Sequence, residues 1–359
     1  MYRVRYVSER EQMEHGLIKI DECVDVMDKM FHVMSEGDYL MSGKNSNSHG
    51  ERLVFEREGD DKNKNIYIAM PAYLGGEYQC TGIKWHGPNV FGSSDTETKY
   101  TLVINDAQTG VPLGFLPANK LTTYRTAAVS IYAAKLCADR RSKTIGIIGP
   151  GKINTVFLDG LLKLFTNITS VKIKGRGRHN VEKLANKIRE EYKQIVDVQI
   201  VDTFEEAVRN SDIVSINTGF EFENIRDMPI IRADWVKSGA MLICTSFIKF
   251  SDDFIVHKAR KIADNMKMYE SYAEELGYPV YRGLSYLGNR YVDLIKEGKI
   301  TKDDIIDLAD IASGRKEARK NEEDIVIFSS GGMGIEDLAV GYHILQKAKE
   351  QNVGTLLEW

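Results

Sequence analysis

A short glycine-rich segment carries the strongest chemical signal in the chain. Gly149-Pro150-Gly151 follows an apolar run and opens a segment with helical periodicity. Glycine permits the tight turn and lets a pyrophosphate approach backbone N–H groups at the start of the helix. We therefore expect a dinucleotide to be bound by Gly149, Gly151, Lys152 and Ile153. Asn154 replaces the third glycine of the usual fingerprint, and an ordinary strand–turn–helix is the alternative interpretation.

The residues after the next predicted strand bear on which dinucleotide binds. In domains selective for NAD, an acidic residue about 20 positions beyond the loop accepts hydrogen bonds from the adenosine ribose. Here the strand ends in Lys174-Gly175-Arg176-Gly177-Arg178, so two guanidinium groups stand where a 2′-phosphate would bind. We predict NAD(P)(H) as cofactor, with NADP(H) favoured. In the alternative, Arg176 and Arg178 are solvated and NAD binds through other groups.

Three cationic residues occur in unusual sequence settings. Lys44 lies in a polar segment, Lys84 interrupts a strand-like run, and Arg125 lies near the start of an Ala-rich helix. Because a buried cation is costly without an anion, the three together predict a clamp for a carboxylate. Each one taken alone is more typical of a surface charge.

A second glycine-rich segment, Gly331-Gly332-Met333-Gly334, follows a predicted strand and begins the last helix. Glycines allow close backbone approach, so we expect Gly332 and Gly334 to contact a flat ring or a phosphate of the cofactor. Glu336 and Asp337 are expected only to favour the N-terminus of that helix.

The pattern of elements predicts how these residues are positioned. From residue 144 onward, apolar β-branched runs alternate with amphipathic helices, which indicates a parallel sheet covered on both faces. Earlier in the chain come a helix over 20–36, a polar stretch over 42–65 that we expect to be a loop, and short strands. We expect a last strand over 324–329 and a last helix to return to the first domain. The predicted fold class is α/β: a Rossmann-type doubly wound parallel sheet domain over 127–314 and a discontinuous α+β domain over 1–126 and 315–359.

Composition disfavours several classes of protein. The 359 residues include 48 Lys and Arg against 52 Asp and Glu, a net charge of −4 without a basic tract, so nucleic-acid binding is not expected. We expect neither a leader nor a membrane span, since no stretch reaches the roughly 18 apolar residues that a span needs. The cysteines are far apart and the histidines lack ligand spacing, so no metal site is expected. A cytoplasmic enzyme or binding protein is the prediction.

The chain resembles the ornithine cyclodeaminase/μ-crystallin family over essentially its whole length. The resemblance rests on motifs in the family's order and spacing: Met70-Pro71-Ala72, Gly82-Ile83-Lys84, Arg125-Thr126-Ala127-Ala128, Gly149-Pro150-Gly151 and Gly334-Ile335-Glu336-Asp337-Leu338. Within the family, the chain most resembles the siderophore-pathway dehydrogenases that act on N-(2-amino-2-carboxyethyl)-glutamate.

The resemblance implies roles for the domains and for single residues. It implies a homodimer in which the discontinuous domain forms the interface and the substrate pocket, with an amino or imino acid as the substrate. Arg125 and Lys44 would bind the substrate carboxylate, and Lys84 would contact the reacting amine or carboxylate. Thr126, the loop glycines and Thr218 would bind the cofactor.

Two departures from the cyclodeaminases bear on the reaction. Those enzymes carry an acidic residue where this chain has Ile68, and a catalytic Asp where it has Lys249 or, without a gap, Ile248. Cyclodeamination needs groups that manage protons at the amine, so these replacements argue against it. We expect an NAD(P)(H)-dependent oxidoreductase that transfers a hydride between nicotinamide and the α-carbon of an amino or imino acid, N-carboxyalkyl amino acids included. Lys84 is the first candidate for proton management and Lys249 the second.

Two alternatives stay open at this point. One is a cyclodeaminase whose acids are displaced, for example to Asp252 or Asp253. The other is a non-catalytic NADPH-binding protein of the μ-crystallin kind.

Overall fold

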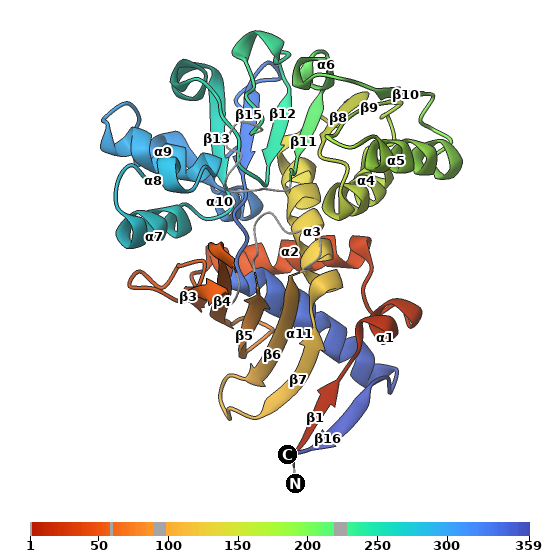
Figure 1. The fold of residues 1–359 in the computed structure, drawn as a ribbon, viewed down its shortest axis with the longest axis vertical. Coiled ribbons are helices and arrows are strands. Elements are labelled where there is room, and N and C mark those ends of the chain that lie inside the picture. The colour runs from red at the N-terminus through yellow and green to blue at the C-terminus, as the bar shows by residue number, and fades with distance from the viewer. Residues whose placement is uncertain (1, 58–59, 89–97, 219–227) are drawn as a thin grey trace. The chain divides into compact units, whose positions relative to one another are not determined.

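The computed structural model describes residues 2–57, 60–88, 98–218 and 228–359 (Figure 1). The chain divides into two compact units. The first contains Met1–Ala128 and Gly332–Trp359, and the second contains most of the residues between them. The chain passes from one unit to the other within helix α3 (Asn119–Cys137) and again at Gly331–Gly332.

The first unit is built on a sheet in which eight described strands take part. They run in the order β16-β1-β7-β6-β5-β4-β2, and β3 pairs with β4. Neighbours are antiparallel except for β1 and β7. The strands span Arg3–Tyr6 (β1), Tyr39–Met41 (β2), Glu51–Arg57 (β3), Asp60–Leu74 (β4), Cys80–Gly87 (β5), Lys99–Asp106 (β6), Pro112–Pro117 (β7) and Thr355–Glu358 (β16).

Three further helices among the described residues belong to this unit: α1 (Glu9–Glu14), α2 (Ile20–Ser35) and α11 (Gly334–Glu350). The helix expected over 20–36 is α2, which buries the apolar side that its spacing predicted, including Met27 and Met30. Helix α11 packs on β4, β5 and β6 (Figure 1).

The two faces of the first sheet differ in exposure. Side chains alternate along a strand, so the cross-strand neighbours Met70, Lys84 and Leu102 share one face, and all three are buried. The opposite face presents Phe55 and Trp85, which are 45% and 38% exposed. We refer to these as the inner and outer faces.

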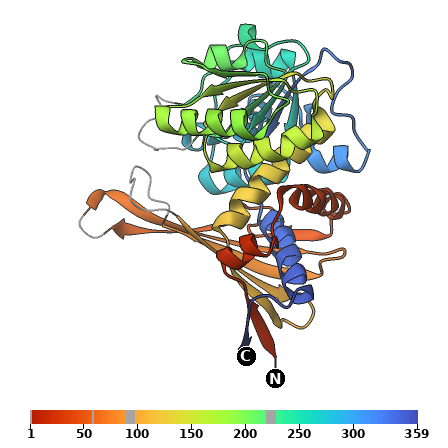
Figure 2. The same ribbon diagram turned by 90° about the vertical axis from the view of Figure 1, so that its right-hand side faces the viewer.

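The polar stretch over 42–65 is largely an antiparallel hairpin of β3 and β4, which extends from the sheet in Figure 2. It was expected to be a loop because it is rich in Gly, Asn and Ser. Since β4 also pairs with β5 from Ile68 to Leu74, the backbone ladder continues into polar sequence. Pairing across the sheet therefore overrides the local propensity.

The second unit is built on a parallel sheet of eight described strands, in the order β10-β9-β8-β11-β12-β15-β13-β14. This is the α/β arrangement that the alternation predicted. The order reverses between β8 and β11, which lie side by side. The strands span Thr144–Ile148 (β8), Ser170–Lys174 (β9), Asp197–Ile200 (β10), Ile213–Ile216 (β11), Met241–Cys244 (β12), Ala259–Ala263 (β13), Ile305–Asp307 (β14) and Ile325–Ser329 (β15).

Helices connect these strands (Figures 1 and 2). They span Lys152–Leu164 (α4), Arg178–Glu191 (α5), Phe204–Val208 (α6), Met266–Leu276 (α7), Val280–Gly283 (α8), Leu287–Lys296 (α9) and Leu308–Ala312 (α10). Every residue of β11 and β12 is buried, as in a parallel sheet that is covered on both faces. Within the described ranges, each helix is too short or too polar to span a bilayer.

The strand over 324–329 was expected to return to the first domain, but it belongs to the sheet of the second unit. β15 pairs with β12 on one side and with β13 on the other. Its run of buried apolar residues, without polar alternation, suits the interior of a parallel sheet. The chain therefore re-enters the first unit at Gly332 and not at residue 315.

Candidate functional site

Four charged side chains form a buried cluster in the first unit. The Lys84 ammonium donates to Asp337 Oδ2 at 2.5 Å. Arg125 donates from Nε to Asp337 Oδ1 at 3.1 Å and from Nη1 to Glu336 Oε2 at 2.7 Å. The side chains of Lys84, Asp337 and Glu336 are at most 1% exposed, and that of Arg125 is 8% exposed. Two cations thus share two carboxylates in an environment that excludes bulk water.

Three elements bring the cluster together. Lys84 lies on the inner face of β5, and Arg125 lies in the first half of the Ala-rich helix α3. Glu336 and Asp337 lie in the first turn of α11. Two of the three cations of the predicted clamp thus lie together, and the protein itself supplies anions that compensate both.

Sequence reasoning underestimated Glu336 and Asp337. They were expected only to favour the N-terminus of a helix, yet both are fully buried and ion-paired. The signal was present in their setting, since two consecutive acids stand between the apolar residues Ile335 and Leu338. Acids flanked in this way are buried only when they are paired.

Some donors of the cluster are not used within the described protein. Arg125 Nη2 makes no hydrogen bond to a described residue, and of the described acceptors only Asp337 receives a bond from Lys84. The Lys84 ammonium lies 5.7 Å from the centre of the Tyr100 ring. Spare N–H groups on a guanidinium that is held in place suit a carboxylate ligand.

The cluster shifts the pKa values of its members. Burial lowers the pKa of Lys84 to about 8, although Asp337 opposes the shift. Burial alone would raise the pKa of Asp337, but Arg125 and Lys84 hold it below its usual value. Burial alone would lower the pKa of Arg125, but Asp337 and Glu336 raise it above the usual range. Lys84 is therefore the member whose charge can change near neutral pH.

His49 was not singled out from the sequence, yet it lies beside this cluster. Its Nδ1 is 2.8 Å from the carbonyl oxygen of Gly332, so Nδ1 carries the proton. Burial, with the charges of Lys84 and Arg125, lowers the pKa of His49 to about 4. A neutral imidazole thus links the loop after β2 to the glycine segment before α11.

Two other predicted residues lie outside the cluster. Lys44 is exposed in the turn between β2 and β3 and forms no hydrogen bond or ion pair with a described residue. Lys249 belongs to the second unit, where its backbone bridges Ile230 and its side chain is exposed. The carboxylate of Asp252 is occupied, because it accepts two bonds from Arg290 and one from Lys299.

In the second unit, the glycine loop lies at the carboxyl end of β8. Gly149 has φ +89°, and a Cβ there would lie 2.0 Å from Asn217 O, so only glycine fits. Gly151 is the N-cap of α4, and a Cβ there would meet nothing within 4 Å. Lys152 is exposed and Ile153 is half-buried in the first turn of the helix. The loop therefore offers open space in front of a helix N-terminus, which suits a phosphate.

Asn154 takes the place of the third fingerprint glycine. Its side chain is buried and donates to the carbonyl oxygens of Ile148 and Gly149, at 3.2 and 2.8 Å. Its Oδ1 accepts a bond from the Ser215 hydroxyl at 2.6 Å. Asn154 thus ties the loop to β8 and β11 through hydrogen bonds, where a glycine would act by close packing alone.

The neighbouring strand completes this edge of the sheet. Asn217 and Thr218 follow β11, and the Thr218 backbone N–H donates to Ser246 Oγ at 3.1 Å. The loop after β8 and the segment after β11 meet where the strand order reverses. In open α/β sheets, ligands bind in the crevice at the carboxyl ends of such strands.

The two arginines after β9 differ in their pairing. Arg178 is 89% exposed and pairs with Glu182 at 2.7 Å. Arg176 is exposed and forms no hydrogen bond or ion pair with a described residue.

The remaining predicted cofactor residues belong to the first unit and have structural contacts of their own. Thr126 Oγ1 donates to Thr122 O in the same helix. A Cβ on Gly332 would lie 2.6 Å from Arg125 Nη1, and one on Gly334 would lie 3.2 Å from the Cβ of Ala72. Both glycines therefore let α11 approach the cluster and the sheet.

Residues 18–352 match the family model described as "Ornithine cyclodeaminase/mu-crystallin family". The chain belongs to this family. One relative is the N-((2S)-2-amino-2-carboxyethyl)-L-glutamate dehydrogenase of Staphylococcus aureus, which is 26% identical over 294 residues that cover 81% of each chain.

Solved structures of the same fold include two enzymes with bound cofactor. An archaeal alanine dehydrogenase dimer with bound NAD has a TM-score of 0.78 and 22% identity over 100% of both chains. The Thermococcus litoralis Delta(1)-pyrroline-2-carboxylate reductase in complex with NADH and L-proline has a TM-score of 0.77 and 23% identity, over 98% of this chain and 99% of that one.

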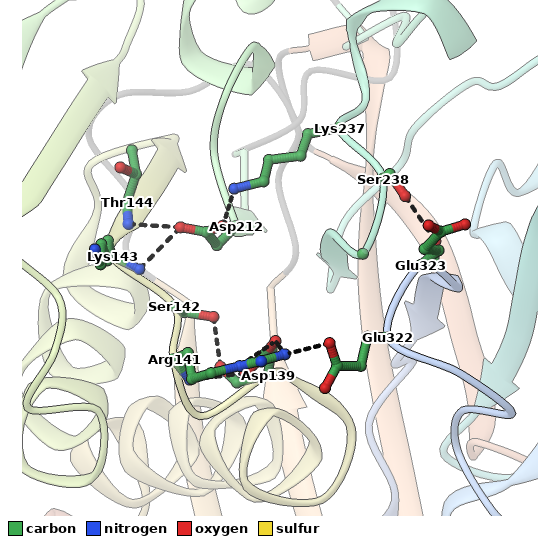
Figure 3. Close-up of a pocket in the computed structure, with 11 residues that line it drawn as sticks. Asp139, Arg141, Ser142, Lys143, Thr144, Asp212, Lys237, Ser238, Glu322 and Glu323 are labelled. Carbon is green, nitrogen blue, oxygen red and sulfur yellow. Dashed lines mark hydrogen bonds and ion pairs between the residues drawn. The ribbon is translucent and has the colours of Figure 1, made fainter.

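The second unit of the present protein also contains a polar cavity of about 510 Å³ (Figure 3). It is lined by residues at the amino ends of β8, β11, β12 and β15, opposite the edge that carries the glycine loop. Its charges are paired with each other, since Asp212 contacts Lys237 and Arg141 contacts Glu322. Its position and its internal pairing make it a poor candidate for the cofactor site.

Replacing Asp337 with Ala is expected to destabilise the protein strongly. The substitution leaves Lys84 and Arg125 without this compensating charge, so the free energy of unfolding should fall by about 3–5 kcal/mol. Denaturant unfolding would measure this change. Glu14→Ala, which breaks the exposed pair with Arg10, is the control and should cost no more than about 1 kcal/mol. Equal effects of the two variants would contradict a structural role for the cluster.

Replacing Asn154 with Ala is expected to lower the free energy of unfolding by about 2–4 kcal/mol, because buried hydrogen bonds are lost and Ser215 is left without its acceptor. Asn154→Gly restores the usual fingerprint but not these bonds, so it should be no more stable than Asn154→Ala. Asn167→Ala removes an exposed amide and serves as the control. A fully stable Asn154→Gly variant would show that close packing alone holds the loop.

Proposed function

We propose that this protein is an NAD(P)(H)-dependent oxidoreductase that transfers a hydride between nicotinamide and the α-carbon of an amino or imino acid. The observation that carries the proposal is the buried cluster of Lys84, Arg125, Glu336 and Asp337, which leaves cationic N–H donors unused. It occurs in a chain whose second unit has a glycine loop at a switch point of strand order. The named relatives act on amino or imino acids, which supports the same reaction class.

The described residues fit a dinucleotide. Gly149 excludes a side chain from the loop, Gly151 leaves open space, and the first turn of α4 presents its N–H groups there. Thr218 lies at the same carboxyl edge of the sheet, where Ser246 holds its backbone N–H and hydroxyl. When bound, the nicotinamide supplies or accepts the hydride.

Arg125 is the proposed anchor of the substrate carboxylate. Nε and Nη1 are held by Asp337 and Glu336, so the guanidinium plane is fixed and Nη2 is available to a ligand. Orientation of this kind lowers the entropic cost of reaching the transition state.

Lys84 is the proposed proton carrier. During oxidation, the neutral amine of Lys84 takes a proton from the substrate α-ammonium, and loss of hydride from the α-carbon then leaves an iminium. During reduction, the α-carbon gains the hydride, and the Lys84 ammonium returns a proton to the amine. A lysine whose pKa is about 8 can take both roles near neutral pH.

Cyclodeamination is less well supported. By the family resemblance, Ile68 and Lys249 (or Ile248, without a gap) stand where cyclodeaminases carry acids. Asp252 is engaged by Arg290 and Lys299. Asp253 is 67% exposed in the second unit and lies 3.7 Å from Lys258. Neither carboxylate has the buried setting that tunes a catalytic acid.

We also propose a homodimer in a reducing compartment such as the cytoplasm. The outer face of the first sheet carries a row of stacked aromatic rings, Phe55 on Tyr67 and Tyr67 on Trp85. Exposed apolar surface of this kind is typical of subunit interfaces, and the archaeal structure of similar fold is a dimer. The four cysteines are buried and form no disulfide, which suits a reducing compartment.

The function is tested by following NADH and NADPH absorbance with a panel of amino acids and of imines formed from keto acids and amines. Lys84→Met should lower kcat/KM by about 100-fold or more, the usual contribution of a positioned acid–base group. Lys249→Met, a matched lysine in the second unit, should retain most of the activity. Binding of cofactor without turnover of any substrate would instead favour a non-catalytic NADPH-binding protein.

Because the pKa of Lys84 is about 8, the two directions should respond oppositely to pH. Oxidation needs neutral Lys84, so its kcat/KM should rise through pH 8. Reduction needs the ammonium, so its kcat/KM should fall above this pH. Steady-state rates would be measured between pH 6 and 10, a range that extends roughly two pH units on each side of the pKa and so should contain the inflection. The same inflection in Lys84→Arg, whose guanidinium does not titrate there, would exclude Lys84 as its source.

Arg176 is expected to set a preference for NADPH over NADH. Removing a charge-assisted contact with the 2′-phosphate should weaken NADPH binding by about 10-fold or more in Arg176→Ala and leave NADH binding unchanged. Arg178→Ala should have a smaller effect, because Glu182 already engages that guanidinium. Calorimetric titration with each cofactor would measure both. Equal affinity of the wild-type protein for the two cofactors would overturn the NADP(H) preference.

A further inference from the structure

The backbone of Gly332 lies directly against the Arg125 guanidinium. A Cβ on Gly332 would lie 2.6 Å from Nη1, 3.1 Å from Nη2 and 3.3 Å from Cζ of Arg125, so this position leaves no room for a side chain. Closely packed groups transmit displacements to one another. A change in the orientation of the Gly332 backbone would therefore move the guanidinium.

Local structure alone does not fix the orientation of Gly332. Its φ of +81° lies in the left-handed region, and glycine moves among backbone conformations more freely than any other residue. The next residue, Met333, is the N-cap of α11, but it makes no side-chain capping hydrogen bond. A capping side chain would otherwise help to fix the start of the helix. The orientation of Gly332 therefore depends on contacts from elsewhere in the first unit.

His49 provides such a contact. Its Nδ1 lies 2.8 Å from the carbonyl oxygen of Gly332 and, because a carbonyl can only accept, Nδ1 is the donor. Burial, together with the charges of Lys84 and Arg125, lowers the pKa of His49 to about 4. The imidazole is therefore uncharged at neutral pH, and this hydrogen bond is compatible with only one of its two tautomers.

The segment that carries His49 is itself held in place on both sides of this residue. Before it, the Ser48 backbone N–H donates to the carbonyl oxygen of Ser42 at 2.7 Å, which closes a turn. After it, Gly50 has φ +150°, and a Cβ there would lie 2.5 Å from the carbonyl oxygen of Ala69, so the segment lies tightly against β4. A side chain on a segment held in this way can position its partner precisely, because little conformational freedom remains to be lost.

We propose that His49 is a positioning residue, which holds the Gly332 carbonyl and thereby keeps the Arg125 guanidinium in the orientation that binds the substrate carboxylate. The inference rests on the proposed function, in which Arg125 anchors that carboxylate. Asp337 and Glu336 hold Nε and Nη1 of the guanidinium through ion pairs, and the Gly332 backbone limits its movement by direct contact. His49 acts through Gly332 and transfers no proton itself.

A matched pair of variants tests the proposal by steady-state kinetics. His49→Asn places an amide nitrogen at the same number of bonds from Cα as Nδ1, so it can still donate to the Gly332 carbonyl. His49→Leu has nearly the same shape as His49→Asn but no donor. His49→Leu should raise KM for the amino or imino acid by about 10-fold, the effect of losing one buried hydrogen bond, and His49→Asn by no more than about 3-fold. Because ground-state binding is what weakens, kcat should change little in either variant.

A control and a pH profile distinguish positioning from proton transfer. His32 on α2 is exposed, and its Nδ1 also lies 2.8 Å from a backbone carbonyl oxygen, that of Asp28, so His32→Leu should change neither KM nor kcat. Since His49 is uncharged where Lys84 titrates, the inflection near pH 8 should persist in both His49 variants. Equal losses in His49→Asn and His49→Leu, or disappearance of the inflection in His49→Asn, would overturn the positioning role.

NMR of the Arg125 side chain separates failure of this inference from failure of the proposed function, because it needs no turnover. The proton–nitrogen signal of the Arg125 Nε–H, assigned through the Arg125 backbone, should shift or broaden in His49→Leu and keep its wild-type position in His49→Asn. If the signal responds in this way but no amino or imino acid is turned over, the proposed function fails and His49 still positions Arg125. If turnover occurs but the signal and KM of His49→Leu match the wild type, only the positioning role fails. His49→Gln, whose amide nitrogen lies farther out, should resemble His49→Leu and replaces it if that variant does not fold.

Discussion

The ion pairs between β5, α3 and α11 are the constraint on which the first unit depends. Burying Lys84 and Arg125 would be prohibitive without Asp337 and Glu336, and burying the acids would be equally costly without the cations. Mutual compensation therefore fixes where α11 begins relative to the sheet. Gly332 and Gly334 follow from the same constraint, since side chains there would meet Arg125 and Ala72. From the sequence, these two glycines were expected to contact the cofactor. The structure shows that close packing also favours glycine at both positions.

This arrangement also accounts for the chemistry that we propose. Because the cluster is neutral as a whole, it does not attract a ligand through net charge. It offers fixed donors instead, Arg125 Nη2 and the Lys84 ammonium, to a substrate that brings its own anion. Preorganised donors in a region shielded from water stabilise charge at no further cost of reorganisation.

Local patterns were enough to predict the second unit, because strand and helix periodicity and the turn chemistry at Gly149 are encoded within a few residues. They could not place β15, since pairing with β12 and β13 is decided by strands far away in sequence. The cluster was half predictable. Lys84 and Arg125 stood out as cations in apolar settings, but their partners lie more than 200 positions away in α11.

The most direct test of the account is the fate of deuterium from a nicotinamide cofactor deuterated at C4 of the dihydropyridine ring. The protein would be incubated with this cofactor and an imino acid, and the product would be analysed by mass spectrometry and NMR. Our account predicts one deuterium at the α-carbon of the amino acid product and one cofactor oxidised for each product molecule. Release of ammonia from an amino acid without net cofactor oxidation, and with no deuterium at the α-carbon of any product, would contradict it.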